Sequence, residues 1–465
     1  MPLTPFAKRL SHEVAMTSPS LAAIILAAGK GTRMKSRLPK VLHPLAGRPL
    51  VAHVIAAVET LAPERVVVVV APGMTDVAEV VAPHQTAIQT RQRGTADAVG
   101  AAHAALSGFT GDVLVLYGDT PLITSETLTA LVAARTGPGQ PAVAVLGMRP
   151  ADPGAYGRLV LADDGSLSEI VEFRDATPEQ KAIDLCNSGV MAVDGARLFE
   201  LLAAVSDDNA KGEFYLTDIV GLARERGLGC AVVEADADEL IGINSRAELA
   251  EAEAIVQNGL RGAAMAEGAT LRDPASVFFS LDTVLGRDVV VDPWVVFEPG
   301  VVVGDNAHIR AFSHIEGATI EAGATIGPYA RLRPGARIGP GARVGNFVEV
   351  KNAELEAGAK ADHLSYIGDA RVGSDANVGA GTITCNYDGF DKARTDIGSG
   401  AFIGSNTALV APVTVGDGAI VGAGSVISRD VPENALALTR APHAEKPLWA
   451  ERFRGRKSAK HKEKG

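Results

Sequence analysis

Short, continuously apolar runs recur through the first half of the chain. They are Leu21–Ala27, Val66–Val70, Val113–Leu116 and Ala142–Leu146. Strands buried on both faces of a parallel sheet show such runs in place of an apolar–polar alternation. Between them lie segments with the spacing of an amphipathic helix, such as Leu50–Leu61 and Thr95–Leu106. This rhythm predicts an open, mostly parallel α/β sheet over residues 21–245, with ligands at the carboxyl ends of its strands.

The pattern becomes helical over residues 246–268. Leu249, Ala252, Val256 and Leu260 recur at helical spacing among Glu and Ala residues, and Gly268 follows as a stop signal. We expect a helix that connects two domains.

Beyond this helix, aliphatic residues recur every six positions. The three runs are Val291, Phe297, Val303, Ile309, Ile315; Ile320, Ile326, Leu332, Ile338, Val344, Val350; and Ile397, Ile403, Leu409, Val415, Val421, Ile427. Each hexad is interpreted as a short strand with its aliphatic side chain inward and glycine at the corner. Three hexads make one coil, and the runs predict about seven coils of a parallel β-helix stacked at ~4.8 Å. This domain is placed at residues 269–440.

The two ends of the chain lack periodicity. Residues 1–20 are predicted to form a flexible extension, within which Met16 is an alternative start. Residues 441–465 are rich in Lys and Arg with little to bury. They predict a basic, disordered tail.

Composition and charge narrow the partners of this 465-residue chain. The formal net charge of −11 disfavours nucleic acid or an anionic membrane as the main partner, but leaves small anions open. The cysteines Cys186, Cys230 and Cys385 are too few and too far apart for a disulfide framework or a zinc ribbon. The apolar run Leu21 to Ala28 is too short to span a bilayer. We expect a cytoplasmic protein without membrane insertion.

A glycine-rich turn leaves the first strand. It reads LAAGKGTRM from Leu26 to Met34, and Leu38-Pro39-Lys40 follows. Backbone N–H groups of such a turn approach phosphates closely, and Arg33 and Lys40 add positive charge. The turn matches neither a Walker A motif nor Gly-x-Gly-x-x-Gly. Taken alone, it is equally a tight connection.

A carboxylate follows the third apolar run, in Tyr117-Gly118-Asp119. This position is the carboxyl end of a predicted strand, where a magnesium ligand is useful. A turn or helix-cap role before Pro121 is the structural alternative.

The repeat register places candidate functional residues on the surface of the β-helix. Arg333 and Lys351 hold the second place of hexads one coil apart, and such stacked cations favour a bound anion over two solvated side chains. His363 occupies a corner position, so it is either a surface histidine or a general base. Glu349, on the coil below, is a candidate to orient it.

Residues at the third position of successive hexads are predicted to stack in two columns. Ala380 repeats the place of His363 one coil later, and Asn386, Ser405 and Ala423 form a second column. Columns on neighbouring faces suggest a groove that a second subunit completes, and therefore a homotrimer.

Longer strings carry a family resemblance. The N-terminal turn, Gln89, Gly94-Thr95, Tyr156-Gly157-Arg158, Ile170-Val171-Glu172, Asn187-Ser188-Gly189 and Gly242-Ile243-Asn244 resemble sugar-phosphate nucleotidyltransferases. Gly358–Asp369 (GAKADHLSYIGD) and Asn377–Gly389 (NVGAGTITCNYDG) extend the match. Over residues 20–440 the chain resembles the bifunctional N-acetylglucosamine-1-phosphate uridyltransferase/glucosamine-1-phosphate acetyltransferase family. That family combines a Rossmann-like, mostly parallel sheet with a left-handed parallel β-helix of hexapeptide repeats and assembles as a homotrimer.

The resemblance implies site residues. For UTP and the UDP-sugar they are Leu26, Ala27, Ala28, Gly29, Lys40, Gln89, Gly94, Thr95, Tyr117, Gly118, Asp119, Gly157, Glu172, Asn187 and Asn244, with Mg²⁺ on Asp119 and Asn244. For glucosamine 1-phosphate they are Arg333, Lys351, Tyr366, Asn377, Asn386 and Tyr387, with His363 as general base. For acetyl-CoA they are Ala380, Ser405, Ala423 and Arg440. Arg33, Lys40 and Glu349 complete the catalytic set.

The implied reactions are acetylation of glucosamine 1-phosphate by acetyl-CoA, then joining of N-acetylglucosamine 1-phosphate to UTP. The UDP-N-acetylglucosamine would feed peptidoglycan synthesis, and in many bacteria lipid A. One alternative makes only the N-terminal half catalytic, with the β-helix as a trimerisation or regulatory module. Another gives that half a different nucleotide and sugar, such as dTTP and glucose 1-phosphate. A non-enzymatic binding protein is the third.

Overall fold

The computed structural model describes residues 20–462, of which 460–462 are described by backbone only. Its contacts divide the chain into two units, Met1–Gln257 and Asn258–Gly465. The division falls within helix α8 (Arg246–Ala266), which matches the predicted connecting helix. Residues 1–19 of the predicted extension, including Met16, lie outside the described residues.

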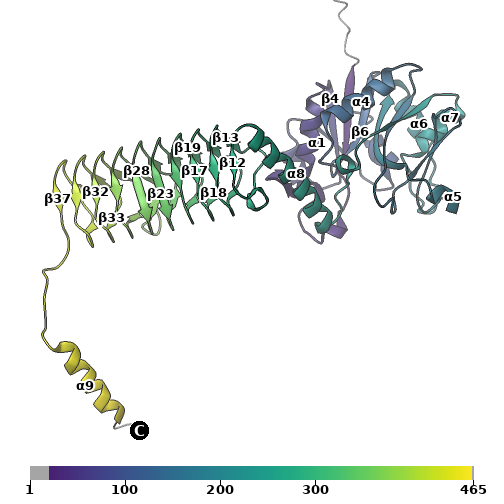
Figure 1. Cartoon of the computed structure of the whole chain (residues 1–465). Helices are drawn as coiled ribbons and strands as arrows, with labels where there is room; N and C mark the ends of the chain where they lie inside the picture. The colour runs from purple at the N-terminus through teal and green to yellow at the C-terminus, as the bar shows by residue number, and fades with distance from the viewer. Residues whose placement is uncertain (1–19, 463–465) are drawn as a thin grey trace, which may run out of the picture. The chain divides into compact units, whose positions relative to one another are not determined.

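The N-terminal unit is built on a mixed, mostly parallel sheet (Figure 1). Its strand order is β11 (Cys230–Glu234), β7 (Val143–Met148), β10 (Cys186–Asp194), β6 (Asp112–Tyr117), β1 (Leu21–Leu26), β4 (Arg65–Val70) and β5 (Gln85–Ile88). Only β10 runs antiparallel to its neighbours on this path. The hairpin of β8 (Arg158–Leu161) and β9 (Leu167–Val171) joins the edge of β10, and β2 (Pro44–Leu45) pairs with β3 (Arg48–Pro49).

Helices cover the sheet. They are α1 (Leu50–Glu59), α2 (Thr75–Val80), α3 (Thr95–Ala101), α4 (Ser125–Thr136), α5 (Pro178–Lys181), α6 (Gly195–Leu202) and α7 (Asp218–Glu225). In β1, Ala22 and Ile24 belong to one core cluster, and Ala23 and Ile25 belong to the other. Both faces of the strand are therefore buried, which explains why its sequence is continuously apolar.

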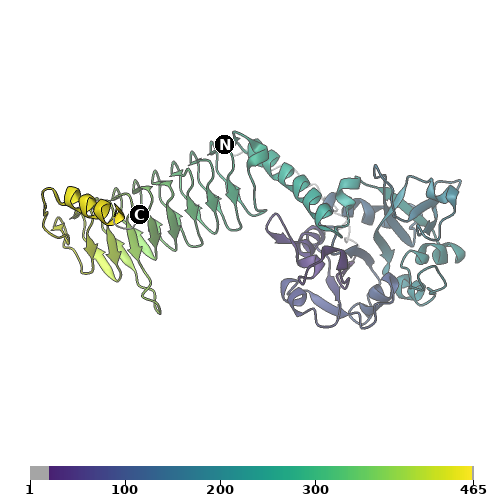
Figure 2. The same ribbon diagram turned by 90° about the horizontal axis from the view of Figure 1, so that it is seen from below.

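The C-terminal unit is a left-handed β-helix with three parallel sheets (Figure 2). The first sheet contains β12 (Thr270–Leu271), β14 (Val290–Val291), β17 (His308–Ile309), β20 (Thr325–Ile326), β23 (Arg343–Asn346), β26 (Lys360–His363), β29 (Asn377–Val378), β32 (Phe402–Ile403), β35 (Ile420–Val421) and β37 (Leu436–Ala437). The second contains β15 (Val296–Phe297), β18 (His314–Ile315), β21 (Arg331–Leu332), β24 (Glu349–Lys351), β27 (Tyr366–Gly368), β30 (Ile383–Cys385), β33 (Ala408–Val410) and β36 (Val426–Ile427). The third contains β13 (Val284–Leu285), β16 (Val302–Val303), β19 (Thr319–Ile320), β22 (Arg337–Ile338), β25 (Glu354–Leu355), β28 (Ala370–Val372), β31 (Thr395–Ile397) and β34 (Val413–Val415).

The inward aliphatic residues of the hexads form one continuous core. Ile309, Ile326 and Val344 succeed one another along the first sheet, and all three are buried. The sheets hold ten, eight and eight strands, so the β-helix is longer than the seven coils predicted. The end strands β12 and β37 lie outside the three hexad runs, which is why counting hexads missed them.

The basic tail differs from expectation. Residues Trp449–Lys462 form helix α9, whereas the sequence predicts disorder. Its side chains are exposed through residue 459. Good helix formers such as Ala, Arg and Lys dominate this segment, and they explain a helix that buries no apolar face.

Candidate active sites

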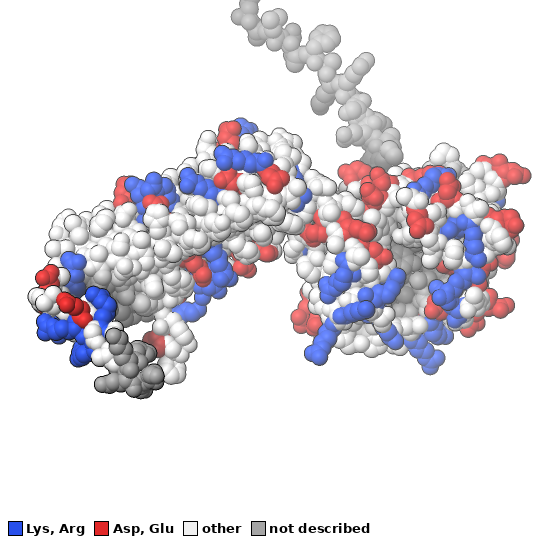
Figure 3. Space-filling model, turned by 60° about the horizontal axis from the view of Figure 1, so that its bottom comes forward, with Lys and Arg blue, Asp and Glu red and all other residues white. Residues whose placement is uncertain are grey.

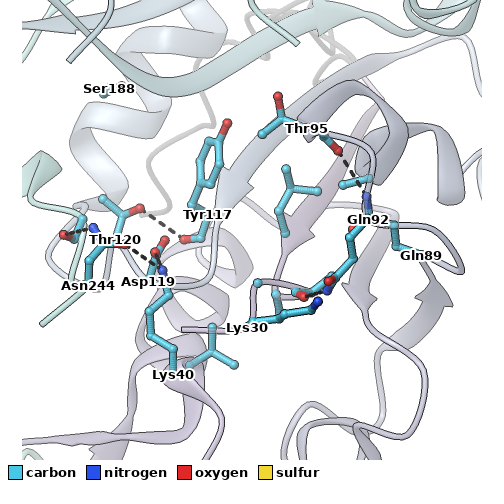
Figure 4. A pocket seen from close by; sticks show the side chains of 18 of the residues that line it. Lys30, Lys40, Gln89, Gln92, Thr95, Tyr117, Asp119, Thr120, Ser188 and Asn244 are labelled. Atoms are coloured by element: carbon cyan, nitrogen blue, oxygen red, sulfur yellow. Dashed lines mark hydrogen bonds and ion pairs between the residues drawn. The ribbon is translucent and has the colours of Figure 1, made fainter. Parts of the chain in front are cut away.

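The first candidate site is a cavity of about 500 Å³ in the N-terminal unit (Figure 4). It opens where β1 and β6 end, at the carboxyl edge that the α/β pattern predicts. Of the predicted nucleotide residues, eleven line it: Leu26, Ala27, Ala28, Gly29, Lys40, Gln89, Gly94, Thr95, Tyr117, Asp119 and Asn244. Gly118 lies beside it and donates its N–H to Leu26 O at 2.9 Å.

The glycine-rich turn packs tightly against the segment that carries Lys40. Gly31 has φ 55°, and a Cβ there would lie 2.6 Å from the Cβ of Lys40. Only glycine satisfies both conditions without strain. Arg33 lies in the 3₁₀ turn Thr32–Met34, is exposed and does not line the cavity. The structure therefore brings Lys40 but not Arg33 into the pocket.

Lys40 joins two residues that are distant in sequence. Its Nζ forms an ion pair with the Asp119 carboxylate and donates to Asn244 Oδ1 at 3.0 Å (Figure 4). Ile243 N–H donates to Asp119 O at 2.8 Å, which fixes the two segments together. Asn244 is also held by Glu248 in the first turn of α8, whose Oε2 accepts from Asn244 N–H at 2.7 Å.

These oxygens fit a divalent cation. The carboxylate of Asp119 and the amide oxygen of Asn244 both contact the Lys40 ammonium, so they converge on one positively charged group. Carboxylate and amide oxygens are hard ligands, and Mg²⁺ is commonly held by one or two carboxylates plus substrate phosphates. Residues 20–459, whose side chains the structure describes, contain no group of three or more His, Cys, Asp or Glu placed to hold a metal by themselves.

Three further predicted residues form a polar region beside the cavity. Asn187 N–H donates to Gly157 O at 2.9 Å, and Glu172 Oε1 accepts from Thr217 Oγ1 at 3.4 Å. Burial raises the pKa of Glu172. Burial also raises the pKa of Tyr117, and the charges of Asp119 and Glu172 add to this effect. The Tyr117 hydroxyl therefore lies within the electrostatic field of both carboxylates.

The sequence assigned no site role to ten other residues that line the cavity, although Lys30, Tyr156, Ser188 and Gly242 stand within the strings that carry the family resemblance. The ten are Lys30, Val41, Gln92, Ala98, Thr120, Tyr156, Ser188, Glu213, Leu240 and Gly242. Gln92 Nε2 donates to Ala28 O at 2.5 Å and so holds the glycine-rich turn. Gln92 stands three residues after Gln89, but nothing in the local pattern marks it.

The second candidate site begins at His363, at the end of β26. Its Nδ1 lies 2.6 Å from Asn346 Oδ1, on the preceding coil of the same sheet. With this oxygen as acceptor, Nδ1 carries the proton and Nε2 keeps the lone pair. The predicted orienting residue, Glu349, instead lies on the second sheet and pairs with Arg333 at 2.9 Å. The Nδ1 atom of His363 is therefore held by Asn346, and among the described residues no hydrogen bond joins Glu349 to His363.

Cations gather on the second sheet as predicted, with one addition. Lys392, from the segment between β30 and β31, lies beside Lys351 and lowers the pKa of Lys351, and Arg333 adds to this effect. The sequence found the Arg333 and Lys351 pair from its register. It missed Lys392 because that residue lies in an insertion that interrupts the hexads.

The remaining predicted sugar-phosphate residues are divided between faces. Tyr366 pairs with Glu349 on the second sheet, and its ring lies over Gly368. Asn386 donates to the Asp369 carboxylate. Tyr387 belongs to a hairpin closed by a bridge to Lys392. Asn377 lies on the first sheet, between Lys360 and Phe402.

A single column replaces the two predicted columns. Gly381 N–H donates to His363 O, Asn406 N–H to Ala380 O, and Gly424 N–H to Ser405 O. His363, Ala380, Ser405 and Ala423 therefore succeed one another along one corner, and Arg440 Nη1 donates to Ala423 O at 3.2 Å. The prediction that Asn386 shares the column of Ser405 and Ala423 is wrong, because the inserted hairpin shifts the hexad count.

Comparison with known proteins fits this division. Residues 23–190 match the MobA-like NTP transferase domain, and residues 282–317, 317–352 and 394–429 match the bacterial transferase hexapeptide (six repeats). Bifunctional protein GlmU of Paramagnetospirillum magneticum is 62% identical over 97% of this chain and 100% of its own length. The proteins of the same name from Rhodospirillum rubrum and Maricaulis maris are 66% and 60% identical over 93% and 95% of this chain, and over 97% and 98% of their own lengths.

The chain belongs to the GlmU family. The N-terminal unit is its nucleotidyltransferase domain, and the β-helix is its hexapeptide-repeat transferase domain. Membership confirms the family resemblance and a bifunctional enzyme. It disfavours two of the alternatives: a non-enzymatic binding protein, and an enzyme in which only the N-terminal half is catalytic and the β-helix is purely structural. Within the described helices, none is long and apolar enough to cross a membrane.

Proposed function

We propose that the β-helix unit acetylates glucosamine 1-phosphate with acetyl-CoA, and that the N-terminal unit transfers a uridylyl group from UTP to the product. The observation that supports this proposal is that the two units carry two different kinds of site. A cavity with Lys40, Asp119 and Asn244 fits nucleotidyl transfer. An exposed histidine with a fixed partner, and a cluster of cations on the adjoining face, fit acyl transfer to an amino sugar phosphate.

In the acetyl transfer, His363 acts as the general base. Its Nε2 removes a proton from the amine as the amine nitrogen attacks the thioester carbonyl. The new C–N bond forms, the C–S bond breaks, and the departing thiolate takes up a proton to become free coenzyme A. Arg333, Lys351 and Lys392 hold the substrate phosphate, while the corner of Ala380, Ser405, Ala423 and Arg440 holds acetyl-CoA.

In the uridylyl transfer, a phosphate oxygen of N-acetylglucosamine 1-phosphate attacks the α-phosphorus of UTP. The bond to the β-phosphate breaks in line, and pyrophosphate leaves. Lys40 and the backbone N–H groups of the glycine-rich turn orient the phosphates and neutralise their charge. Asp119 and Asn244 would hold Mg²⁺, which supplies further charge neutralisation. Arg33 reaches this site only if the turn that carries it moves.

We also propose that the β-helix assembles as a homotrimer. Its corner between the first and second sheets carries a column of exposed apolar residues: Trp294, Phe312, Tyr329, Phe347 and Leu364. They are 47–60% exposed, and the rings of Phe312, Tyr329 and Phe347 stack at 4.8 and 5.1 Å. A contiguous apolar column on a soluble protein favours burial against another protein. It is continuous with His363, beside Leu364, so copies of this chain are its best occupants.

Charge and cysteine usage support the remaining assignments. Figure 3 shows charges of both signs interspersed on the N-terminal unit, and a stretch of the β-helix unit with few charges. Such a surface suits small-molecule substrates and a second copy better than nucleic acid. Cys186, Cys230 and Cys385 are free, in keeping with a reducing cytoplasm. We place the functional domains at residues 21–245 and 269–440, joined by the helix over 246–268.

Two assays on the purified chain test this function. The first follows thiol release from acetyl-CoA with and without glucosamine 1-phosphate. The second follows pyrophosphate release from UTP with N-acetylglucosamine 1-phosphate and Mg²⁺. We expect both products, each dependent on its sugar phosphate. Pyrophosphate formation without any thiol release would mean that the β-helix is structural.

Light scattering tests the assembly. Wild type is expected to have the mass of three chains, and Tyr329→Glu to have that of one. The variant should also lose acetyl transfer and keep uridylyl transfer, because only the exposed corner is changed. A variant that stays at three chains would place the interface elsewhere.

A further inference from the structure

Gln89 belongs to the wall between two hollows of the N-terminal unit. It lines the candidate nucleotide cavity, together with Gly94 and Thr95 (Figure 4). It also lines a neighbouring hollow of about 770 Å³, which Asp97 and Phe214 share. Its exposed fraction is only 5%. The direction of its amide is therefore set by protein contacts and not by solvent.

Both protein partners of this amide are hydrogen-bond acceptors. Gln89 Nε2 donates to Gly94 O at 3.1 Å and to Asp97 Oδ2 at 3.0 Å. A carbonyl and a carboxylate only accept, so the atom that faces them must be the NH₂ group. Both N–H bonds are then used. Among the described residues, no group donates a hydrogen bond to Gln89 Oε1, which turns away from Asp97 and remains for a ligand.

The Asp97 carboxylate is held on its other side. Its Oδ1 accepts from Arg93 Nε at 3.1 Å and from Arg93 Nη2 at 2.6 Å, and the Arg93 guanidinium lies 5.0 Å from the Phe214 ring centre. Asp97 stands in the first turn of α3. Gly94, which precedes the helix, has φ 130°, and a Cβ there would lie 2.3 Å from Phe214 O. The segment that carries both acceptors is thus fixed by its packing.

We propose that Asp97 is a positioning residue that holds the Gln89 amide with its oxygen toward the nucleobase, so that the cavity selects uracil over cytosine. Uracil presents an N–H at ring position 3, which the Gln89 oxygen accepts. Cytosine presents only a lone pair there, which would oppose that oxygen. A reversed amide would lose both of its acceptors and would set its oxygen against the Gly94 carbonyl and the Asp97 carboxylate. The inference rests on the proposed uridylyl transfer, in which Gln89 contacts the base.

The first test is Asp97→Ala, assayed with UTP and with CTP. In this variant a reversed amide gives up one acceptor instead of two, so cytosine is rejected less strongly. We expect the ratio of kcat/KM for UTP to that for CTP to fall about tenfold, the effect of one hydrogen bond to a charged group. Asp76→Ala is the matched control, because Asp76 also lies in the first turn of a helix, α2, but is exposed and lines neither hollow. Its ratio should stay at the wild-type value.

The second test reverses the hydrogen bond. Gln89→Glu sets a carboxylate against Asp97 and should lower kcat/KM for UTP by about a hundredfold. Adding Asp97→Asn to that variant supplies an NH₂ group that donates to the new carboxylate at position 89. The amide oxygen introduced at position 97 still accepts from Arg93. The double variant should recover about tenfold over Gln89→Glu alone, as expected for two residues in direct contact.

The outcomes separate this inference from the proposed function. A wild-type enzyme that uses UTP and CTP equally well overturns the uridylyl assignment, and this inference with it. A wild-type preference for UTP with an unchanged ratio in Asp97→Ala overturns the inference alone, and Asp97 is then merely structural. A double variant no better than Gln89→Glu overturns the direct contact between residues 89 and 97.

Discussion

The two units of this chain build their sites in opposite ways. In the β-helix, residues 17 or 18 positions apart lie side by side, as Asn346 and His363 do. In the N-terminal unit, Lys40 reaches partners 79 and 204 positions away. A periodic fold converts sequence spacing directly into contacts, whereas an α/β sheet gathers its site from loops at one edge.

The sites also differ in their exposure to water. The side chains of Lys40 and Asp119 are only 12% and 14% exposed. His363, by contrast, is exposed on a surface corner. Charge interactions are stronger in a shielded cavity, so Lys40 and Asp119 attract each other more strongly than an exposed pair would. The second site is open, and we expect a neighbouring copy to exclude water from it.

The largest expected effect separates the two activities at the exposed corner. His363→Ala should lower acetyl transfer roughly 10²–10⁴-fold, the usual contribution of a general base. Uridylyl transfer should be unchanged, because His363 belongs to the other unit. Thiol release and pyrophosphate release measured on the same preparation give both numbers.

A second histidine on the β-helix provides the control. His314→Ala removes a surface histidine of β18 whose nearest partner is Glu298 at 3.6 Å. Its acetyl transfer should match that of wild type. An equal loss in both variants would mean that the loss in His363→Ala comes from damage to the β-helix and not from removal of the proposed general base.

The second effect makes the reverse separation. Asp119→Ala should lower uridylyl transfer about 10²–10³-fold, because under the proposed function it removes a carboxylate that would hold Mg²⁺ at the phosphates. Acetyl transfer should be retained. Asp152→Ala, an exposed carboxylate of the same unit outside the cavity, serves as control. Undiminished pyrophosphate release in Asp119→Ala would contradict the metal assignment.

A smaller effect tests the contact that the sequence missed. Asn346→Ala should lower kcat for acetyl transfer about tenfold with little change in KM, because the ring of His363 loses its fixed orientation. Asn346→Asp should move the acid limb of the pH–rate profile to higher pH, because a carboxylate stabilises the protonated ring. A substitution of Glu349 should leave the acid limb of the pH–rate profile at the same pH as in wild type. The reverse pattern would restore Glu349 as the orienting residue.

The smallest effect concerns stability of the N-terminal unit. Burial raises the pKa of Asp218 to about 6, and the charges of Glu172, Asp175 and Glu169 add to this. The folded state therefore binds this proton more tightly than the unfolded chain does. Its ionisation weakens folding as the pH rises from about 4 to above 6. Asp218→Asn should raise Tm by roughly 2 °C at pH 8 and leave it unchanged at pH 4.

A second carboxylate, whose pKa is shifted in the opposite direction, completes that comparison. Hydrogen bonds from Ser166 lower the pKa of Asp164, so its ionised form favours the folded state above the unfolded pKa. Asp164→Asn should lower Tm slightly at pH 8 and have no effect at acid pH, below both pKa values. Calorimetry of both variants at the two pH values distinguishes the signs. Shifts of the same sign in both would contradict the electrostatic account.

Periodicity explains which parts of the fold were predictable. The buried strands of the N-terminal sheet follow from continuously apolar runs, and β1, β4, β6 and β7 lie where those runs predict. The hexads likewise predict the β-helix and the neighbouring positions of Arg333 and Lys351. Prediction failed where the period breaks, at the hairpin that carries Tyr387 and Lys392. Asn386 was consequently assigned to the wrong column.

The sequence by itself determined the two folds and placed a ligand site at the edge of the N-terminal sheet. Local spacing and glycine-rich turns encode these features, and they need no knowledge of distant contacts. The family resemblance, and not spacing, implied residues such as Gln89, Thr95 and Asn244, which line the cavity. Only the tertiary structure decided that Asn346 and not Glu349 faces His363, and that Lys40 meets both Asp119 and Asn244. It also decided that Asp97 holds Gln89. The reason is geometric: a corner of the β-helix turns adjacent residues apart, and loops from separate strands converge in ways that no spacing records.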